Sequence, residues 1–264
     1  MKTSKSGRNV TYTTRLKPLT NQEKGKTMNK WEAQTLFCTA KDKAKGKPIA
    51  NNTRLFKRGE DYAVRLHNTD VVTIHSDDTY TLNTGGWRTV TTKERINRFS
   101  PARVYSDKKV WLVKTGFGEY GGSLFEDGMK VTKRGVALEY NDPAEGFALQ
   151  RKLDNLVRNY INGFCKLIES KELKDPDAGD CWFCSMFNQD KAHGNKESVD
   201  HLFSHFEEKY YVPSLLANAM KERSYGDVGY VWQLTKAGGT DWARMSLRNY
   251  FKNRQEALLE QLKG

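Results

Sequence analysis

Cys181-Trp182-Phe183-Cys184, followed after sixteen residues by His201-Leu202-Phe203-Ser204-His205, is the stretch around which the second half of the chain is expected to fold. Cysteines separated by two residues place both sulfur atoms on one side of a tight turn, and histidines four residues apart lie on one face of a helix. Zn²⁺ binds four nitrogen or sulfur ligands in a tetrahedron. The spacing therefore predicts a structural zinc site, and its ligands are Cys181, Cys184, His201 and His205.

Other interpretations of this stretch stay open. The thiols can be free and buried, and the histidines can be ordinary core or surface side chains. His193, in the intervening loop, can replace either histidine as a ligand. A redox Cys-x-x-Cys motif is disfavoured, because no strand–helix–strand pattern surrounds it. The histidine helix is expected to begin after Ser198, a good N-cap, and to end near Tyr211.

The pattern of apolar residues predicts an α+β fold. From residue 53 to about residue 140, short alternating stretches with Gly and Asp turns predict a small antiparallel barrel or curled sheet, including a hairpin that turns at Asp127-Gly128. Beyond Pro143, apolar side chains recur at helical spacing. We therefore expect a basic, disordered tail at residues 1–29, a β-rich module at 30–142, and a helical module with the zinc knuckle at 143–264.

The positive charge is concentrated at one end of the chain. The 264 residues carry a net charge of +12, and residues 1–58 hold fifteen Lys and Arg against three acidic residues, so the remainder is neutral. A basic arm on a neutral body indicates a polyanionic partner, with nucleic acid (DNA or RNA) favoured over an anionic membrane. A tail that only improves solubility is the alternative.

Two segments are candidates for contacting nucleic acid. The loop from residue 41 to residue 48 is rich in lysine and can follow a phosphate backbone. Gly85-Gly86, followed by Trp87 and a short helix capped by Thr92, combines backbone amides, hydroxyls and basic side chains as phosphate sites do. Trp87 can stack on a base or lie in the core. The candidate residues are Lys41, Lys43, Lys45, Lys47, Trp87, Arg88, Lys93 and Arg95.

Two further functional classes compete with simple nucleic-acid binding. His67, Asp70 and His75 can hold Mg²⁺ or Mn²⁺ for phosphodiester hydrolysis, although such residues more often occupy strand ends and turns. The other alternative is an interaction module that inhibits a host protein. Since the favoured interpretation needs no catalysis, we do not expect an enzyme.

The cysteine content and the lack of long apolar stretches indicate the compartment. Four cysteines in 264 residues do not form a disulfide scaffold, so we expect a reducing environment, the cytoplasm. Neither a secretory signal nor a membrane span is visible in the sequence, and no membrane partner is expected.

Three stretches, at residues 65–72, 85–97 and 204–216, resemble a group of bacteriophage and environmental proteins without a known activity. The resemblance covers most of residues 30–225 and leaves out the N-terminal tail. It implies a phage setting and supplies no site.

Overall fold

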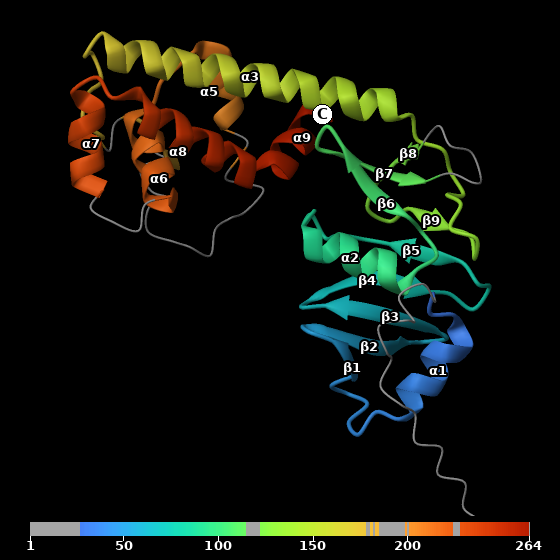
Figure 1. Cartoon of the computed structure of the whole chain (residues 1–264). Coiled ribbons are helices and arrows are strands. Elements are labelled where there is room, and N and C mark those ends of the chain that lie inside the picture. The colour runs from blue at the N-terminus through green and yellow to red at the C-terminus, as the bar shows by residue number, and fades with distance from the viewer. Residues whose placement is uncertain are drawn as a thin grey trace, which may run out of the picture.

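The computed structural model describes residues 27–114, 122–177, 180–181, 183–184, 199, 201–223 and 228–263. Within them the chain has a β-rich N-terminal part and a helical C-terminal part, as the sequence predicted (Figure 1). Residues 1–26 of the predicted tail lie outside the described residues, as do Ser198 and His193. The end of that tail is not disordered, because Asn29 caps the first described helix and the Met28 carbonyl accepts from the Tyr80 hydroxyl at 3.2 Å. None of the described helices is both long and apolar enough to cross a lipid bilayer.

Six antiparallel strands form the larger sheet, in the order β1-β2-β3-β4-β5-β9. The first five follow one another along the chain, so that each pairs with its sequence neighbour through a tight connection. The strands are β1 (Lys47–Ala50), β2 (Thr53–Arg58), β3 (Asp61–Leu66), β4 (Thr69–Ile74), β5 (Tyr80–Leu82) and β9 (Lys130–Val131).

This sheet has one buried face and one exposed face, as alternating strands predict. Helices α1 (Lys30–Cys38) and α2 (Val90–Phe99) cover the buried face, where Phe37 packs edge-on against Tyr62 and Ile96 lies in the same core. Within the described part of the chain, the opposite face carries mostly polar, exposed or half-buried side chains, together with the buried Ala63. The core side chains of the sheet are Leu55, Tyr62, Val64, Leu66, Val71, Val72, Ile74, Tyr80, Leu82 and Val131.

A second, three-stranded antiparallel sheet contains β6 (Val104–Asp107), β7 (Val110–Lys114) and β8 (Gly122–Leu124). The predicted hairpin is therefore wrong, because the turn at Asp127-Gly128 leads from β8 into β9 of the other sheet. Two backbone bonds fix this exchange, from the Leu82 amide to the Met129 carbonyl and from the Gly128 amide to the Leu82 carbonyl. The described strands thus form two sheets instead of one barrel.

Helix α3 (Pro143–Glu169) opens the helical part, with Asp142 as its N-cap and Pro143 in its first turn. It lies along the remaining helices (Figure 1) and contacts α5, α8 and α9. Pro213 begins a helix as predicted, but the histidine helix α5 is shorter than predicted and ends where Lys209 turns left-handed, with φ of 53°. The remaining elements are α5 (Leu202–Glu208), α6 (Pro213–Arg223), α7 (Val228–Lys236), α8 (Thr240–Asn253) and α9 (Gln255–Lys263).

The two parts meet where the start of α3 and helix α9 reach the smaller sheet. Val110, Leu112 and Leu124 form a small apolar cluster there, against which Phe147 packs. Gly146 allows this approach, because a Cβ at this position would lie 2.5 Å from Leu124 Cδ1. Helices and strands therefore share one continuous structure.

Candidate metal centre and basic surface

The four predicted metal ligands come together at the edge of the helical core. Cys181 and Cys184 lie in a short turn in which the Cys184 amide donates to Cys181 Sγ at 3.5 Å. His201 directly precedes α5, and His205 lies one turn further along it. One ligand atom from each residue can be chosen so that all four lie within 4.8 Å of one another. The structure thus confirms that these residues form a cluster that can hold a metal ion.

The separations inside this cluster are close to those of a tetrahedral site. Cys184 Sγ lies 3.3 Å from His201 Nε2 and 3.7 Å from His205 Nε2. The usual zinc–sulfur and zinc–nitrogen bond lengths in a tetrahedron place sulfur and nitrogen about 3.5 Å apart. The two imidazole rings stand at 87° to each other, with centroids 5.2 Å apart. These two sulfur–nitrogen separations are compatible with tetrahedral metal coordination.

The protonation of the ligands depends on their burial. His205 is 4% exposed, and burial together with the nearby His201 lowers its pKa to about 4, so its imidazole is neutral and can donate a lone pair. Cys184 is 1% exposed, and burial together with the adjacent Cys181 raises the pKa of its thiol. A thiolate at this position therefore needs a positive charge beside it, and a coordinated metal cation supplies one.

Hydrogen bonds tie the cysteine turn to α6. Asn218 Nδ2 of α6 donates to the Cys184 carbonyl at 2.6 Å, and the Ser214 amide donates to Asp180 Oδ2 at 2.8 Å. On the outer side, Phe183 stacks on the His201 ring with centroids 5.0 Å apart. A metal in the cluster would therefore join the cysteine turn, α5 and α6 into one unit.

The lysine loop before β1 is exposed and has a fixed shape. Asp42 Oδ1 accepts from the amides of Ala44 and Lys45, which closes a local turn. Arg54 Nη1 of β2 donates to the carbonyls of Lys45 and Gly46, at 2.8 and 3.1 Å, and holds the loop against the sheet.

Three of the four candidate lysines in this loop point into solvent. Lys41, Lys43 and Lys45 are exposed, and only Lys45 of these has a described carboxylate partner, Asp42 at 3.7 Å. Lys47 is half-buried, and its Nζ donates to the Thr39 carbonyl at 3.4 Å. The loop thus presents three ammonium groups for a phosphate backbone.

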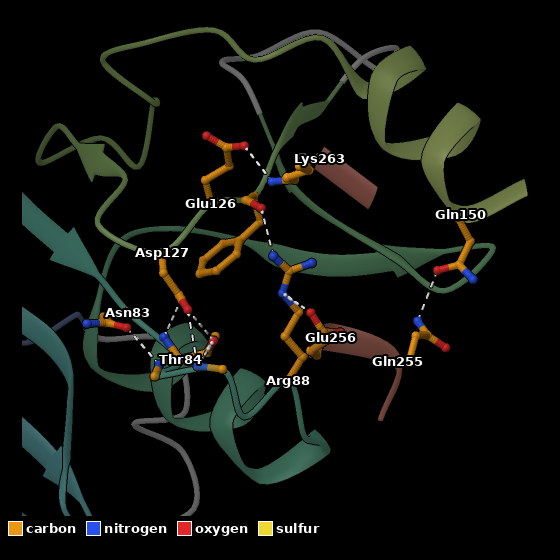
Figure 2. Close-up of polar contacts among 12 residues, drawn as sticks. Asn83, Thr84, Arg88, Glu126, Asp127, Gln150, Gln255, Glu256 and Lys263 are labelled. Carbon is orange, nitrogen blue, oxygen red and sulfur yellow. Dashed lines mark hydrogen bonds and ion pairs between the residues drawn. The ribbon is translucent and has the colours of Figure 1, made fainter. Parts of the chain in front are cut away.

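An internal carboxylate occupies the Gly-Gly turn that the sequence indicates as a phosphate site. Asp127 accepts hydrogen bonds from the Thr84 amide, from the Thr84 hydroxyl at 2.8 Å and from the Gly86 amide at 3.2 Å (Figure 2). The helix begins three residues earlier than predicted, with Thr89 as the N-cap that accepts from the Thr92 amide. A phosphate at this turn would have to displace Asp127, so the turn is a structural element.

Arg88 joins the two parts of the molecule. Its Nε lies 3.1 Å from Glu256 Oε2 of α9, and its Nη2 lies 3.4 Å from the Phe125 carbonyl (Figure 2). Lys263, also of α9, forms an ion pair with Glu126 at 3.1 Å. Both ion pairs line a cavity of about 290 Å³. The Arg88 side chain is 19% exposed, so it holds α9 against the β-rich part and does not form a free surface cation.

Lys93 and Arg95 are also engaged within the protein. Lys93 Nζ lies over the Trp111 ring, 4.6 Å from its centroid, and donates to Ser106, and burial lowers the pKa of its ammonium group. Arg95 is 12% exposed, donates to Thr53 Oγ1 at 2.8 Å and pairs with Glu94. Trp87 alone of this predicted group is open to solvent, with 69% of its surface exposed.

Replacing Arg88 by alanine is expected to lower the free energy of unfolding by about 2 kcal/mol near neutral pH, because it leaves the largely buried Glu256 carboxylate without its cation. Burial raises the pKa of Glu256 even though Arg88 opposes the shift. Losing Arg88 raises this pKa further. A folded-state pKa above the unfolded value means that protonation favours the folded state, so the loss should shrink as the pH falls. Urea unfolding at two pH values measures both effects.

Arg98→Ala is the matched control for Arg88→Ala. The Arg98 side chain is 44% exposed on α2; it has a long ion pair with Glu94 at 3.9 Å, and its guanidinium carbon lies 5.2 Å from the centroid of the Phe99 ring. Its loss should cost less than about 0.5 kcal/mol and should show no comparable pH dependence. Equal effects of the two substitutions would contradict the assignment of Arg88 to the interface.

Of the three residues of the nuclease alternative, Asp70 and His75 are engaged by other side chains, and His67 is exposed in a turn. His67 lies in the turn between β3 and β4 with φ of 51°. Asp70 pairs with two arginine side chains at 3.0 and 2.7 Å, and His75 contacts Asp61 at 2.8 Å and Thr81 at 2.7 Å through its two ring nitrogens. Among the described residues these three form no group that could hold a metal ion. No feature of the described structure favours a magnesium- or manganese-dependent nuclease.

Two carboxylates that determine this part of the molecule were not singled out from the sequence. Asp127 accepts hydrogen bonds from Thr84 and Gly86, which precede it by 43 and 41 positions in the sequence. Glu256 forms an ion pair with Arg88, which lies much earlier in the chain. No local spacing links such partners. The Asp-Gly pair at residues 127–128 signals a turn, but it does not reveal which amides the aspartate will bind.

Residues 28–132 match the model of a family described as Kyanoviridae Gp96 protein. The match runs from just before α1 to just after β9, so it includes the larger sheet and the lysine loop and excludes the metal-ligand cluster. It agrees with the phage setting implied by the sequence resemblance. No curated protein and no solved structure matches the chain.

Proposed function

We propose that the Cys181–Cys184–His201–His205 cluster binds Zn²⁺ as a structural ion. Two sulfur and two imidazole donors at tetrahedral spacing are the set that zinc prefers among common metals. Four protein ligands leave no open position for a substrate, so the ion would stabilise the fold without taking part in catalysis.

We propose further that the protein binds nucleic acid through its basic N-terminal part, residues 1–58. The observation that carries this proposal is the charge distribution, in which these residues hold the entire net charge of +12. Lys41, Lys43 and Lys45 show how part of this charge is displayed, because they extend from a loop that Asp42 and Arg54 hold in place. A fixed loop loses little conformational entropy when it binds a phosphate backbone.

The proposal can be tested by fluorescence anisotropy with the full-length protein and labelled single-stranded DNA, duplex DNA and RNA at low salt. Changing Lys41, Lys43 and Lys45 together to glutamine should weaken binding about tenfold or more, since each lost phosphate contact removes a favourable electrostatic term. The control changes Arg151, Lys152 and Lys166 of α3 to glutamine, which removes the same charge from exposed positions outside the basic part.

Wild-type protein that binds none of these nucleic acids at low salt would rule the proposal out. An equal loss in the lysine-loop variant and the α3 control would show that only net charge matters. A stable complex with an acidic host protein that survives nuclease treatment, in the absence of oligonucleotide binding, would instead favour the interaction module.

A further inference from the structure

The open face of the six-stranded sheet has a distinct chemical composition. The register places Arg54, Arg58 and Arg65 on this face, because their strand neighbours Leu55 and Val64 point into the core. Lys130 belongs to the same face, since it pairs with Thr81 and the adjacent Val131 is buried. The face thus carries four basic side chains against two carboxylates, Asp61 and Asp70.

The arginines at the centre of this face are rigidly placed. The guanidinium carbons of Arg58 and Arg65 lie 5.0 and 5.1 Å from the centroid of the Phe56 ring. Asp70 accepts from Nε of both, at 3.0 and 2.7 Å. Burial opposes ionisation of Asp70, but these two arginines outweigh it and hold its pKa below the usual range. Two guanidinium groups therefore share one carboxylate, and one positive charge is left over.

Only some of the N–H groups of these arginines donate hydrogen bonds within the described part of the protein. Among the described residues, no acceptor contacts the terminal nitrogens of Arg65, whose side chain is 34% exposed. Asp61 is engaged by His75 and the Ser76 amide, and among the described residues it forms no ion pair with the arginines. A planar, fixed and half-exposed guanidinium group is suited both to phosphate oxygens and to stacking on an unpaired base.

The open face is continuous with the lysine loop. Gly46, with φ of 68°, sits so close to β2 that a Cβ there would lie 2.8 Å from the Leu55 carbonyl oxygen and 2.9 Å from the Phe56 ring. Arg54 connects the same loop to the sheet. At the β9 edge of the sheet, the Leu138 amide donates a hydrogen bond to the Lys130 carbonyl, and the Leu138 side chain is exposed. Basic groups thus lie toward both edges of the sheet, whose six strands span about 24 Å at the usual strand spacing.

We infer that this open face is the surface along which a single-stranded nucleic acid lies, with its backbone reaching the lysine loop at the β1 edge. The inference rests on the proposed function and names its surface and substrate class. Charge complementarity favours a polyanion, and an exposed sheet with fixed arginine planes can contact unpaired bases, which a duplex keeps stacked inside. The central contacts are Phe56, Arg58 and Arg65.

Two variants of the full-length protein test this surface. Thr73→Glu places a negative charge in the middle of the face without removing any proposed contact, and Asn155→Glu makes the same charge change on exposed α3. Arg58→Gln with Arg65→Gln removes the central cations, and Arg151→Gln with Lys152→Gln is its charge-matched control. Each face variant should weaken binding to labelled oligothymidylate or polyuridylate about tenfold, and each control by less than about twofold.

The outcomes separate this inference from the proposed function. If only the lysine-loop variant weakens binding, the open face is not the binding surface, although nucleic-acid binding stands. If the wild-type protein binds no nucleic acid, both fail. Duplex DNA that binds as tightly as the single strand and loses affinity equally in the face variants would overturn the single-strand assignment. Should the double arginine variant melt early, Thr73→Glu still decides the question.

Discussion

Replacing Cys184 by alanine is expected to abolish metal binding and to lower the free energy of unfolding by at least about 4 kcal/mol, because a structural zinc site contributes its binding free energy to folding. For a chain of this size that corresponds to a fall of roughly 10 °C in the melting temperature. Cys184 is fully buried in the helical core and lies next to both histidine nitrogens. Metal analysis and thermal unfolding of the same preparations measure the two effects.

Cys165→Ala is the matched control, because Cys165 is an equally buried thiol of α3 that lies outside the cluster. Both substitutions remove one sulfur atom from the helical core, so the difference between them reports the metal. A chelator should lower the melting temperature of the wild type and of Cys165→Ala but should leave Cys184→Ala unchanged. A wild-type protein with a zinc content near zero, or equal losses in the two variants, would disprove the zinc site.

The metal-ligand cluster could be predicted because its chemistry is local in sequence. Two residues separate the cysteines, and one helical turn separates the histidines, so each pair is placed by its own backbone. Only the meeting of the two pairs depends on the rest of the fold. The helix around His205 was predicted too long, because nothing in the apolar pattern marks the left-handed turn at Lys209.

The Gly-Gly turn shows why a binding site cannot be predicted from local sequence alone. Backbone amides, hydroxyls and basic side chains do gather near residues 84–95, but the anion they bind is the carboxylate of Asp127. Arg88 likewise meets the carboxylate of Glu256. A sequence reveals that a segment can bind an anion, whereas long-range folding decides whether that anion comes from the protein or from a ligand.

The open sheet face was visible in the sequence only as strand alternation. Thr53 and Leu55 of β2 are buried, whereas Arg54 and Arg58 are exposed, and the two-residue period of a strand places both arginines on one side. Their convergence with Arg65 and Asp70 requires the register of three strands, and register depends on turns and a bulge between β3 and β4. The sequence alone does not reveal how the strands pair, so it could not predict that these side chains converge.

The affinity for single-stranded nucleic acid is expected to fall about a thousandfold between low and physiological salt, because binding through many phosphate contacts releases condensed counterions. Changing Lys41, Lys43 and Lys45 to glutamine should reduce the slope of log affinity against log salt by about two, at roughly 0.7 per contact. Deleting residues 1–26, which hold seven basic residues against one acidic residue, should flatten it further. Titrations at several salt concentrations give each slope directly.

The deletion must stop before α1 for this comparison to be valid. Ala33 and Phe37 of that helix are buried in the core of the larger sheet, so a longer truncation would unfold the surface being tested. The α3 variant Arg151→Gln, Lys152→Gln, Lys166→Gln removes the same charge as the lysine-loop variant and should keep the wild-type slope. Slopes that are equal in all four proteins would mean that phosphate contacts lie elsewhere, since a counterion slope counts contacts and not net charge.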